Sequence, residues 1–524
     1  MSHQQSLTGV SLIAGQPGSR DGETFRAYNP ADGQPIDPAY YSASEPEFNA
    51  AVEGAAAAAP FLAASSGADR AKLLRAMADA IDAAAGALIE RAHLETALPD
   101  QRLKGEVART SNQLRLFANV AEEGSWVMAR IDTADPQRTL PKPDIRSMLR
   151  PLGPVAVFGA SNFPLAFSVA GGDTASALAA GNPVIVKAHP AHPGTSELAG
   201  RALTSAIEQC GFPAGTFSLL FDAGIRIASA LVRHPLIRAV GFTGSFQGGR
   251  ALMDLAASRE QPIPVYAEMG SANPVFILPR ALRERGESIA TGLHTSFTLG
   301  AGQFCTKPGL VFVNNSDAPF LAKLRALTAN GPGFSLLSAE IAKAYTAGLQ
   351  KRSALSATTG PQKDAGFAVQ AALLEMDYAT FANDPSLHEE LFGPSTLLIT
   401  GAGHKELIGA ARALTGHLTA SIFGTDDDLR DYAELISILE TKVGRIVFNG
   451  FPTGVEVTHA MVHGGPYPAT SDGRSTSVGS QAILRFARPV CYQDFPQHAL
   501  PAELKDTNPR KILRLWNGVW QLNP

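Results

Sequence analysis

Hydrophobic and polar positions change their spacing twice along the first half of the chain. Between residues 44 and 117, apolar residues recur at helical spacing among Ala, Glu and Arg, which predicts several consecutive helices. From residue 151, short apolar runs such as 155–158 and 183–187 alternate with helix-like stretches. Runs of this kind are typical of strands buried on both faces, and their alternation with helices predicts parallel βαβ units. A second α/β unit is expected over residues 317–447.

Residues 127–131 and 144–149 form two extended-type segments joined by a connection rich in Pro, Asp and Thr. They predict a long hairpin that projects from the body, whose unpaired edge can pair with another subunit. Residues 482–487 are expected to return as a strand that completes a sheet with this hairpin. Residues 448–479 are dense in Gly, Pro, Thr and His, and they are too long for a simple connector, so we expect them to be functional.

Composition excludes several classes of function. The chain has 524 residues, 45% hydrophobic and 18% charged, with a net charge of -4, which is too long for one ordinary domain. The absence of Lys/Arg runs argues against a nucleic acid or an anionic membrane as partner. Three cysteines give no disulfide framework, and the start lacks a secretory pattern, so we expect a cytoplasmic protein. No cluster has metal-site spacing, so no metal is expected.

One cysteine stands out. Cys305 lies in the glycine-flanked segment 300–306, where the backbone can turn sharply and present a thiol. On local sequence alone, a buried small hydrophobe is the better interpretation, and partners elsewhere in the chain are needed to make it a nucleophile. Glu268 follows an apolar strand, where a carboxylate is either paired structurally or poised as a base, and the local sequence does not decide between the two.

Polar residues also follow the other predicted strands. Lys187 ends a buried strand and therefore needs water, an acid or a ligand. The Gly-x-Gly-x-x-Gly fingerprint is absent from the first strand–helix turn. Gly244, Ser245 and Gly249 could set backbone amides near a phosphate, although a tight turn explains them equally well. Asn162 lies just beyond the end of another strand.

Taken together, these residues resemble the aldehyde dehydrogenase superfamily over nearly the whole chain. Any one motif is weak, but six in the family's order are specific. The six motifs are Asn162-Phe163-Pro164, Lys187, Phe242-Thr243-Gly244-Ser245, Glu268-Met269-Gly270, Gly302-Gln303-x-Cys305 and Glu390-x-Phe392-Gly393-Pro394.

The resemblance implies an α/β fold with a Rossmann-type cofactor domain, an α/β catalytic domain and a small β arm for oligomerisation, as a homodimer or homotetramer. The implied division is 1–125 and 152–266 for the cofactor domain, 267–479 for the catalytic domain, 126–151 and 480–495 for the arm, and 496–524 for a C-terminal tail.

The resemblance also implies roles for individual residues. Cys305 would attack the aldehyde, the Asn162 amide and the Cys305 N–H would stabilise the oxyanion, and Glu268 would activate water to hydrolyse the thioester. The implied cofactor-binding residues are Lys187 at the adenosine ribose, Gly244, Ser245 and Gly249 at the pyrophosphate, Glu390 at the nicotinamide ribose, and Phe392 and Ser161 beside them.

Cofactor preference follows from a departure from the family pattern. Many NAD-preferring members have a glutamate three residues after the lysine, and here that position is Pro190. Without a carboxylate to repel it, a 2′-phosphate is admissible, with His189, His192 or Arg226 as its partner. We therefore expect NADP to be preferred and NAD to be accepted.

The run 448–470 is similar to the branch of the superfamily that oxidises 2-oxoglutarate semialdehyde. The substrate carboxylate calls for a cation, and Arg109, on the polar helix segment 106–115, and Arg474 are the candidates. The alternative for that segment is a solvated face, and His459 and His463 are expected to be satisfied loop or core residues.

Alternative functions are an NADP-linked aliphatic aldehyde dehydrogenase, a CoA-acylating enzyme, which Glu268 disfavours, and a catalytically retired scaffold.

Overall fold

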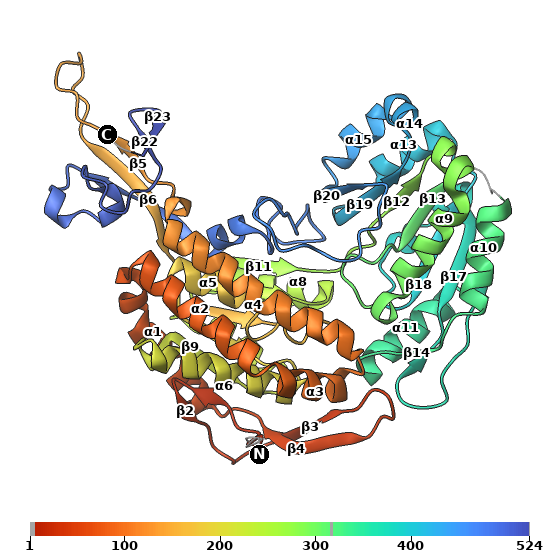
Figure 1. The fold of residues 1–524 in the computed structure, drawn as a ribbon, viewed down its shortest axis with the longest axis horizontal. Coiled ribbons are helices and arrows are strands. Elements are labelled where there is room, and N and C mark those ends of the chain that lie inside the picture. The colour runs from red at the N-terminus through yellow and green to blue at the C-terminus, as the bar shows by residue number, and fades with distance from the viewer. Residues whose placement is uncertain (1–5, 315–317, 523–524) are drawn as a thin grey trace.

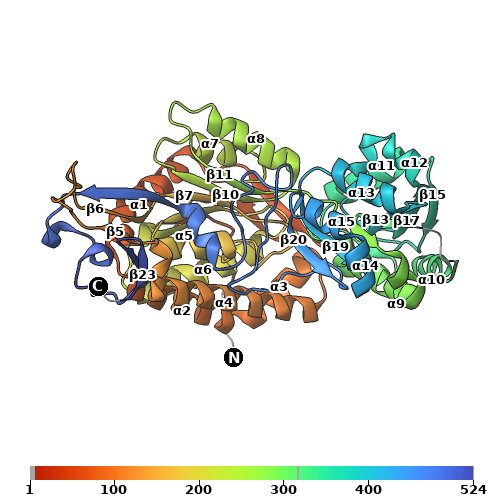
Figure 2. The same ribbon diagram turned by 90° about the horizontal axis from the view of Figure 1, so that it is seen from above.

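Figure 1 shows two α/β lobes and a slender β arm in the computed structural model, which describes residues 6–314 and 318–522. Each lobe is built on one seven-stranded sheet. The arm leaves the first lobe on the side away from the second lobe, as Figures 1 and 2 both show. The predicted α/β fold with two α/β lobes and a β arm is confirmed. Within the described residues, no helix is both long and apolar enough to cross a bilayer.

The first sheet has the strand order β11-β10-β7-β8-β9-β1-β2, and the strands from β11 to β9 are parallel. Every residue of β7, β8 and β9 is buried, because hydrophobic clusters fill both faces of the sheet. The strands are β1 (Leu12–Ile13), β2 (Gln16–Pro17), β7 (Val155–Phe158), β8 (Val184–Lys187), β9 (Phe217–Leu220), β10 (Ala239–Thr243) and β11 (Val265–Glu268). The helices of this lobe are α1 (Glu45–Ala64), α2 (Gly67–Ala83), α3 (Ala85–Thr96), α4 (Asp100–Glu123), α5 (Gly172–Ala180), α6 (Pro193–Gln209), α7 (Arg226–Arg233) and α8 (Phe246–Ala257).

The second sheet has the order β15-β17-β18-β13-β12-β19-β20, in which only β15 pairs antiparallel. Its strands are β12 (Val275–Ile277), β13 (Leu310–Val313), β15 (Ser356–Thr359), β17 (Ala372–Asp377), β18 (Ser395–Thr400), β19 (His417–Phe423) and β20 (Val443–Phe448). Its main helices are α9 (Pro279–Thr298), α10 (Ala318–Ala329), α11 (Ala339–Lys351), α12 (Tyr378–Ala382), α13 (His404–Ala413), α14 (Asp426–Asp431) and α15 (Ala433–Leu439). Two small sheets, β3 (Thr24–Tyr28) with β4 (Pro35–Tyr41) and β14 (Phe334–Ser335) with β16 (Ala368–Val369), complete the lobes.

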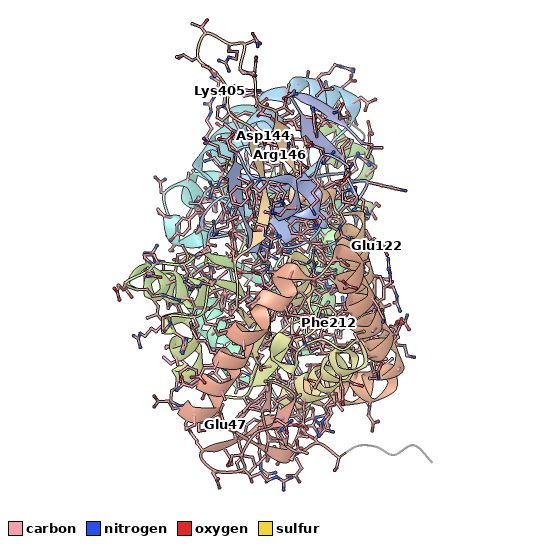
Figure 3. The ribbon with its side chains drawn as sticks, turned by 90° about the vertical axis from the view of Figure 1, so that its left-hand side faces the viewer. Glu47, Glu122, Asp144, Arg146, Phe212 and Lys405 are labelled. Atoms are coloured by element: carbon pink, nitrogen blue, oxygen red, sulfur yellow. The ribbon has the colours of Figure 1, made fainter. Side chains whose placement is uncertain are left out.

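The arm is a five-stranded sheet in the order β21-β6-β5-β22-β23. β5 (Arg130–Asp132) and β6 (Ile145–Pro151) form the predicted hairpin, and β21 (Ala487–Gln493) pairs antiparallel with β6 over seven positions. Residues 496–524 were expected to be a separate tail, but β22 (Arg514–Trp516) and β23 (Val519–Gln521) extend the arm sheet from β5. Arg146 ties the two segments together, because its guanidinium contacts both Asp144 and Asp506; Figure 3 labels Arg146 and Asp144 on the arm.

The strand predicted over residues 482–487 is wrong. These residues form the 3-10 helix η5 (Ser480–Phe486), and the strand begins only at Ala487. Ala482, Ile483 and Phe486 are buried in the core of the first lobe, and Arg485 pairs with Asp173 of α5. With three residues per turn, Ile483 lies over Phe486 and Ala482 over Arg485, whereas a strand would put the two members of each pair on opposite faces.

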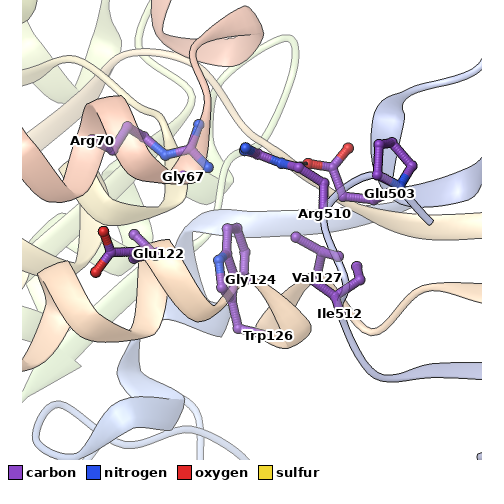
Figure 4. Close-up of a pocket in the computed structure, with 11 residues that line it drawn as sticks. Gly67, Arg70, Glu122, Gly124, Trp126, Val127, Glu503, Arg510 and Ile512 are labelled. Carbon is purple, nitrogen blue, oxygen red and sulfur yellow. Dashed lines mark ion pairs between the residues drawn. The ribbon is translucent and has the colours of Figure 1, made fainter. Parts of the chain in front are cut away.

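A cavity with a volume of about 130 Å³ lies where the arm joins the first lobe (Figure 4). Arg70, Trp126, Glu503 and Arg510 are among the side chains that line it, and the Glu503 carboxylate lies 3.6 Å from the Arg510 guanidinium. None of its lining residues is a predicted site residue. The cavity therefore belongs to the junction of arm and lobe, and the site lies elsewhere.

Candidate active site

Cys305 follows a turn that few sequences can form. The 3-10 helix η3 (Leu299–Gly302) continues α9, and Gly300, Ala301 and Gly302 have φ of 57°, 58° and 67°, in the left-handed region. A Cβ on Gly302 would lie 2.1 Å from the Gly393 carbonyl oxygen, so only glycine fits at this position. The turn leaves the Cys305 side chain half-buried, and the predicted nucleophile is accessible.

Asn273 fixes the cysteine segment through hydrogen bonds to its backbone. Its fully buried side-chain amide donates to the carbonyls of Cys305, Lys307 and Ser271, at 2.8, 2.9 and 3.0 Å. The Ser271 hydroxyl donates to Asn273 Oδ1 at 2.8 Å, which fixes the orientation of the amide. Ser271 stands where the family has a second glycine, and here it has a structural role. The sequence did not predict this role of Asn273. Two of the carbonyls that it binds lie 32 and 34 residues away, and the third belongs to Ser271, two residues before it.

Asn162 reaches the same segment from the first lobe. It lies in the loop after β7, and its Nδ2 donates to the Gln303 carbonyl at 2.8 Å. Its own carbonyl accepts from Arg102 of α4 at 2.7 Å. No hydrogen bond of the Cys305 backbone N–H is found within residues 6–314 and 318–522. The Asn162 amide therefore hydrogen-bonds to the segment that carries Cys305, and this amide and the Cys305 N–H are the candidate donors for an oxyanion.

Glu268 and Cys305 are joined by a third side chain, His463. The His463 Nε2 lies 3.2 Å from Cys305 Sγ, and its Nδ1 lies 3.1 Å from Glu268 Oε2. Glu268 ends β11 and is 7% exposed, and His463 is 4% exposed. His463 is a buried loop residue with partners at both ring nitrogens, as expected, but those partners are the predicted nucleophile and base. His459 is exposed. The only sequence signal for His463 was its position in the 448–479 segment.

Charge and burial oppose one another in this group of three. Burial lowers the pKa of His463, but the negative charges and hydrogen bonds of Cys305 and Glu268 outweigh it and raise the pKa to about 10. Burial raises the pKa of Glu268, while the contact with His463 acts in the opposite direction. The raised pKa of His463 favours its imidazolium form, and burial makes Glu268 a stronger base than an exposed carboxylate.

The C-terminal loop reaches the site by pairing with β11. Glu268 forms an isolated antiparallel bridge with Thr470, and Met269 N–H donates to the Ala469 carbonyl at 2.8 Å. Ser471 exchanges hydrogen bonds with the backbone of Ala267. This pairing covers the free edge of the first sheet and brings His463 beside Glu268, 195 residues away in sequence.

One face of α4 supports the loop that carries Asn162. The Glu106 carboxylate accepts from the N–H groups of Leu165 and Ala166, at 2.9 and 3.1 Å. Burial raises the pKa of Glu106, and the charge of Arg102 opposes that shift. The solvated-face alternative for residues 106–115 is therefore wrong on this side of the helix, because Glu106 is 4% exposed.

Arg109 lies one turn further along α4, and its side chain contacts Val455 and Phe167. Its Nη1 donates to the Val455 carbonyl at 2.5 Å, and its guanidinium lies 5.0 Å from the Phe167 ring centroid. Its Nε and Nη2 atoms are buried with no hydrogen-bond partner in the described residues. Burial lowers the pKa of Arg109, and a negative charge on Cys305 opposes that shift, which places the guanidinium within electrostatic range of the thiol.

A second arginine, Arg445 of β20, approaches from the other lobe. Its Nη2 donates to the Pro452 carbonyl at 2.6 Å. Burial lowers its pKa, Cys305 opposes this shift, and the charge of Arg109 adds to it. Among the described residues, neither arginine forms an ion pair within 4.0 Å, and Glu106 and Glu456 act on Arg109 only from a greater distance. Two half-buried cations without a direct ion pair therefore lie within electrostatic range of the nucleophile.

Arg474, the other predicted anchor, is not part of the site. Its side chain is 93% exposed and pairs with Asp472 at 3.0 Å. The sequence could not separate Arg109 from Arg474, because both follow polar segments and only the fold turns one inward.

Lys187 and the start of α8 lie at the carboxyl ends of β8 and β10, two parallel strands of the first sheet with β7 between them. Lys187 is 9% exposed; burial lowers its pKa to about 8, and the nearby Asp222 opposes that shift. The Ser245 hydroxyl accepts from the Gly248 N–H at 3.2 Å and caps α8. The Gly244 N–H donates to the Glu268 carbonyl at 3.0 Å, so the helix N-terminus is next to the base.

Gly249 has a packing role in place of the predicted phosphate contact. A Cβ at this position would lie 2.6 Å from Met269 Sδ, so glycine is required for α8 to approach the strand beside it. Its N–H donates to the Ser245 carbonyl as an ordinary helical bond, which leaves it no donor for a ligand.

Glu390 has the free acceptor that a ribose needs. Its Oε1 is buried without a hydrogen-bond partner in the described residues. Burial raises its pKa to about 7, and Lys307 opposes that shift. Lys307 in turn donates to the carbonyls of Leu391 and Ser395, at 3.0 and 2.8 Å, and so joins the cysteine segment to the Glu390 segment. Phe392 is half-buried next to these residues. These groups fit a nicotinamide ribose, whose hydroxyls would donate to Glu390.

The predicted partners of a 2′-phosphate differ in their surroundings. His192 is fully buried with its Nε2 3.1 Å from the Ala160 carbonyl, and its ring stacks on His189. Burial lowers the pKa of both rings, so both are neutral and neither presents a cation. Arg226 is exposed at the start of α7 and donates to the Ala43 carbonyl. Ser161 is half-buried beside Asn162.

Comparisons with known proteins agree with this geometry. Residues 18–467 match the sequence model described as the aldehyde dehydrogenase family. The chain is 50% identical to alpha-ketoglutaric semialdehyde dehydrogenase 2 of Azospirillum brasilense, over 98% of this chain and 99% of that protein. It is 44% identical to alpha-ketoglutaric semialdehyde dehydrogenase of Acinetobacter baylyi, with the same coverage.

Solved structures share the fold at lower identity. The betaine aldehyde dehydrogenase of Staphylococcus aureus in complex with NAD+ aligns with a TM-score of 0.79 at 21% identity, over 94% of this chain and 96% of that one. The structure of PnpE in complex with nicotinamide adenine dinucleotide aligns with a TM-score of 0.77 at 21% identity, over 93% and 97% of the two chains.

Proposed function

Because the chain belongs to the aldehyde dehydrogenase family, we propose that it oxidises 2-oxoglutarate semialdehyde to 2-oxoglutarate with NAD(P). The names of the relatives that are 50% and 44% identical over nearly their full length support this substrate. The observation that carries the proposal is the pair of uncompensated arginines, Arg109 and Arg445, beside Cys305. Retention of the thiol, the base and the oxyanion donor argues against a retired scaffold.

The reaction begins when Cys305 Sγ forms a bond to the aldehyde carbon. The carbonyl oxygen becomes an alkoxide, which the Asn162 amide and the Cys305 N–H stabilise. The alkoxide reforms its carbonyl as the hydrogen on carbon departs with its electron pair, and a thioester on Cys305 is the result. NAD(P), when bound, accepts that hydride. Lys187, the N-terminus of α8 and Glu390 are the groups that would hold it.

Water then releases the acid. Glu268 removes a proton from the water that attacks the thioester carbon, the carbon–sulfur bond breaks, and the thiolate of Cys305 is restored. The buried position of Glu268 suits this role, because burial raises its pKa towards the working range. A base that activates water also disfavours a CoA-acylating enzyme.

The arginine pair distinguishes this substrate from an aliphatic aldehyde. The two unpartnered nitrogen atoms of Arg109 can donate to both oxygens of one carboxylate. An aliphatic aldehyde leaves those buried donors of Arg109 unsatisfied and gives the charge of Arg445 no partner, which costs free energy. A site without these arginines would have favoured the aliphatic alternative.

Variants of the two arginines test the substrate proposal. Arg109→Met and Arg445→Met are expected to lower kcat/KM for 2-oxoglutarate semialdehyde by about 10- to 100-fold each, since hydrogen bonds to a charged group are lost. The kcat/KM for pentanal, which lacks the carboxylate, should change less than about threefold or rise. Arg474→Met is the matched surface control. Equal losses for both aldehydes would contradict a carboxylate anchor and indicate a structural role.

We further propose that NADP is preferred to NAD. Pro190 removes the carboxylate that would repel a 2′-phosphate, and Arg226 is an exposed cation at the start of α7. Arg226→Ala should raise the KM for NADP and leave the KM for NAD unchanged. A wild-type enzyme that is faster with NAD at low concentration would contradict this preference.

The proposal includes a cytoplasmic homodimer or homotetramer that assembles through the arm. The three cysteines, Cys210, Cys305 and Cys491, are all free, which suits a reducing compartment. The edge strands β21 and β23 offer unpaired backbone to another subunit.

A further inference from the structure

We propose that His463 is a catalytic residue, which in the resting enzyme has taken the Cys305 proton and holds the cysteine as a thiolate. The cysteine chemistry on which this rests is that of the proposed function, and the substrate may be any aldehyde. The carrying observation is geometric: one imidazole contacts Cys305 Sγ at 3.2 Å and Glu268 Oε2 at 3.1 Å, through its two different nitrogen atoms.

The backbone of His463 is held on both sides by hydrogen bonds. The backbone N–H of His463 donates to Thr476 Oγ1 at 2.9 Å, and its carbonyl accepts from the Ser477 N–H at 2.8 Å. The ring centroid lies 6.1 Å from that of Phe167. The pairing of the C-terminal loop with β11 fixes the distance to Glu268. A loop histidine held on both sides by backbone bonds is preorganised for its contacts.

Two arrangements of protons satisfy both contacts as hydrogen bonds. In both, Nδ1 carries a proton towards Glu268, because a carboxylate can only accept. In the first, the Cys305 S–H donates to Nε2 of a neutral ring; in the second, Nε2 carries the proton that left the thiol and donates to a thiolate. The raised pKa of His463 favours the second arrangement.

The surrounding charges are consistent with an ion pair. Beside the thiol are three cations, Arg102 and Arg109 of α4 and Arg445 of β20, and each of them is within electrostatic range of Cys305. Behind Glu268 lie Arg485 of η5 and Asp173 of α5, which are paired with each other at 2.6 Å. The carboxylates that face these arginines are Glu106, which lies 4.0 Å from Arg102, and Glu456, which acts on Arg109. Three cations against these two carboxylates leave an excess positive charge that favours an anionic sulfur.

The proton balance follows from these positions. The thiol proton moves from Sγ to Nε2 before substrate arrives, and the thiolate then forms the bond to the aldehyde carbon. The imidazolium stays protonated beside the tetrahedral adduct while the hydride leaves with its electron pair. Glu268 binds His463 through Oε2, which leaves Oε1 to take the proton from the attacking water. Bond cleavage restores the thiolate next to the same imidazolium.

The test is the pH dependence of Cys305 alkylation by iodoacetamide, without substrate or cofactor, read by mass spectrometry on the Cys305 peptide. The wild-type rate is expected to stay within about twofold from pH 6 to pH 8.5. In His463→Asn the rate should fall about tenfold per pH unit below pH 8, as for an ordinary thiol. His459→Asn is the matched loop control, and N-acetylcysteine is the reference thiol.

The wild-type profile alone can overturn the proposal, whether or not a variant folds. A wild-type rate that falls with acid like that of N-acetylcysteine would contradict a resting thiolate. An unchanged flat profile in His463→Asn, or in His463→Gln, would show that the arginines hold the charge and that His463 does not. Because the assay uses no aldehyde, its outcome is independent of whether 2-oxoglutarate semialdehyde is the substrate.

Discussion

The residues that decide the chemistry are polar groups at the edges of two lobes, and each is held by contacts distant in sequence. Asn162 comes from the first sheet, Cys305 from the end of α9, and His463 from the C-terminal loop. None has a local reason to be near another. Their convergence is a property of the fold, and the energetic effect of removing one depends on what its partners are left without.

Lys187 should give cofactor binding a pH dependence. Its pKa is lowered to about 8 by burial, so the ammonium is present at pH 7 and lost as the pH rises through 8. The KM for NAD(P) should therefore rise between pH 7 and pH 9, by up to about tenfold for one lost charge-assisted hydrogen bond. Lys187→Met should have a high KM at all pH values. A wild-type KM that is flat across this range would contradict the role of the charged form.

Asn273 should matter more than any exposed asparagine. Asn273→Ala removes three hydrogen bonds to buried carbonyls, so we expect the free energy of unfolding to fall by about 2–4 kcal/mol and kcat to fall with it. Chemical denaturation and initial rates measure the two effects. The control is Asn383→Ala, which removes one exposed bond and should cost less than about 1 kcal/mol. Similar losses in both variants would contradict the account.

At the scale of elements, the sequence predicted those strands and helices whose burial follows from their own residue pattern. The strands β7 and β8 are short runs in which every side chain is apolar or aliphatic along its stem, and their burial follows from that pattern. The run 482–487 is also apolar, but whether it is a strand or a 3-10 helix depends on the core of the first lobe against which it packs. Pattern alone does not hold that information.

The candidate site was predicted to the extent that the family motifs mark it. Cys305, Glu268 and Asn162 lie together as expected. His463 and Asn273 were missed, because a histidine in a loop and an asparagine before a proline have many ordinary explanations. The sequence made Arg109 and Arg474 equal candidates for the carboxylate anchor. The structure separates them, because Arg109 is partly buried on α4 and Arg474 is exposed. The contacts between residues far apart in the chain could not be predicted from the sequence pattern.

Two glycines should respond to alanine in opposite directions. A Cβ at Gly302 meets the Gly393 carbonyl and the residue has a φ of 67°, so Gly302→Ala should lower the free energy of unfolding by more than about 2 kcal/mol and abolish activity. Gly105, inside α4, has open space at its Cβ, so Gly105→Ala should raise it by about 0.5–1 kcal/mol. Thermal or denaturant unfolding checks both signs. A neutral Gly302→Ala would contradict the packed turn.

At the scale of the whole molecule, the arm exposes apolar side chains that a monomer would leave in water. Phe495, Val519, Trp520 and Leu522 are each between 47% and 61% exposed on or next to the arm sheet. Figure 1 shows β22 and β23 on the arm, which projects from the first lobe, and the proposed assembly would cover this surface with another chain.

Charge on this surface should therefore change the state of assembly. Trp520→Glu is expected to shift the protein to a smaller species in analytical ultracentrifugation, because a carboxylate cannot be buried unpaired in an interface. Leu94→Glu, on α3 at 38% exposure, is the control and should leave the assembly unchanged. A wild-type monomer, or an unaltered oligomer in Trp520→Glu, would contradict the role assigned to the arm.

The most direct test of the account is the initial rate of oxidation of 2-oxoglutarate semialdehyde, compared with hexanal and succinate semialdehyde, with NADP and NAD in parallel. The account predicts the highest kcat/KM for 2-oxoglutarate semialdehyde and a loss of activity of several orders of magnitude in Cys305→Ala. Faster turnover of hexanal would contradict the substrate that the arginine pair indicates. Full activity in Cys305→Ala would contradict the nucleophile on which the whole account depends.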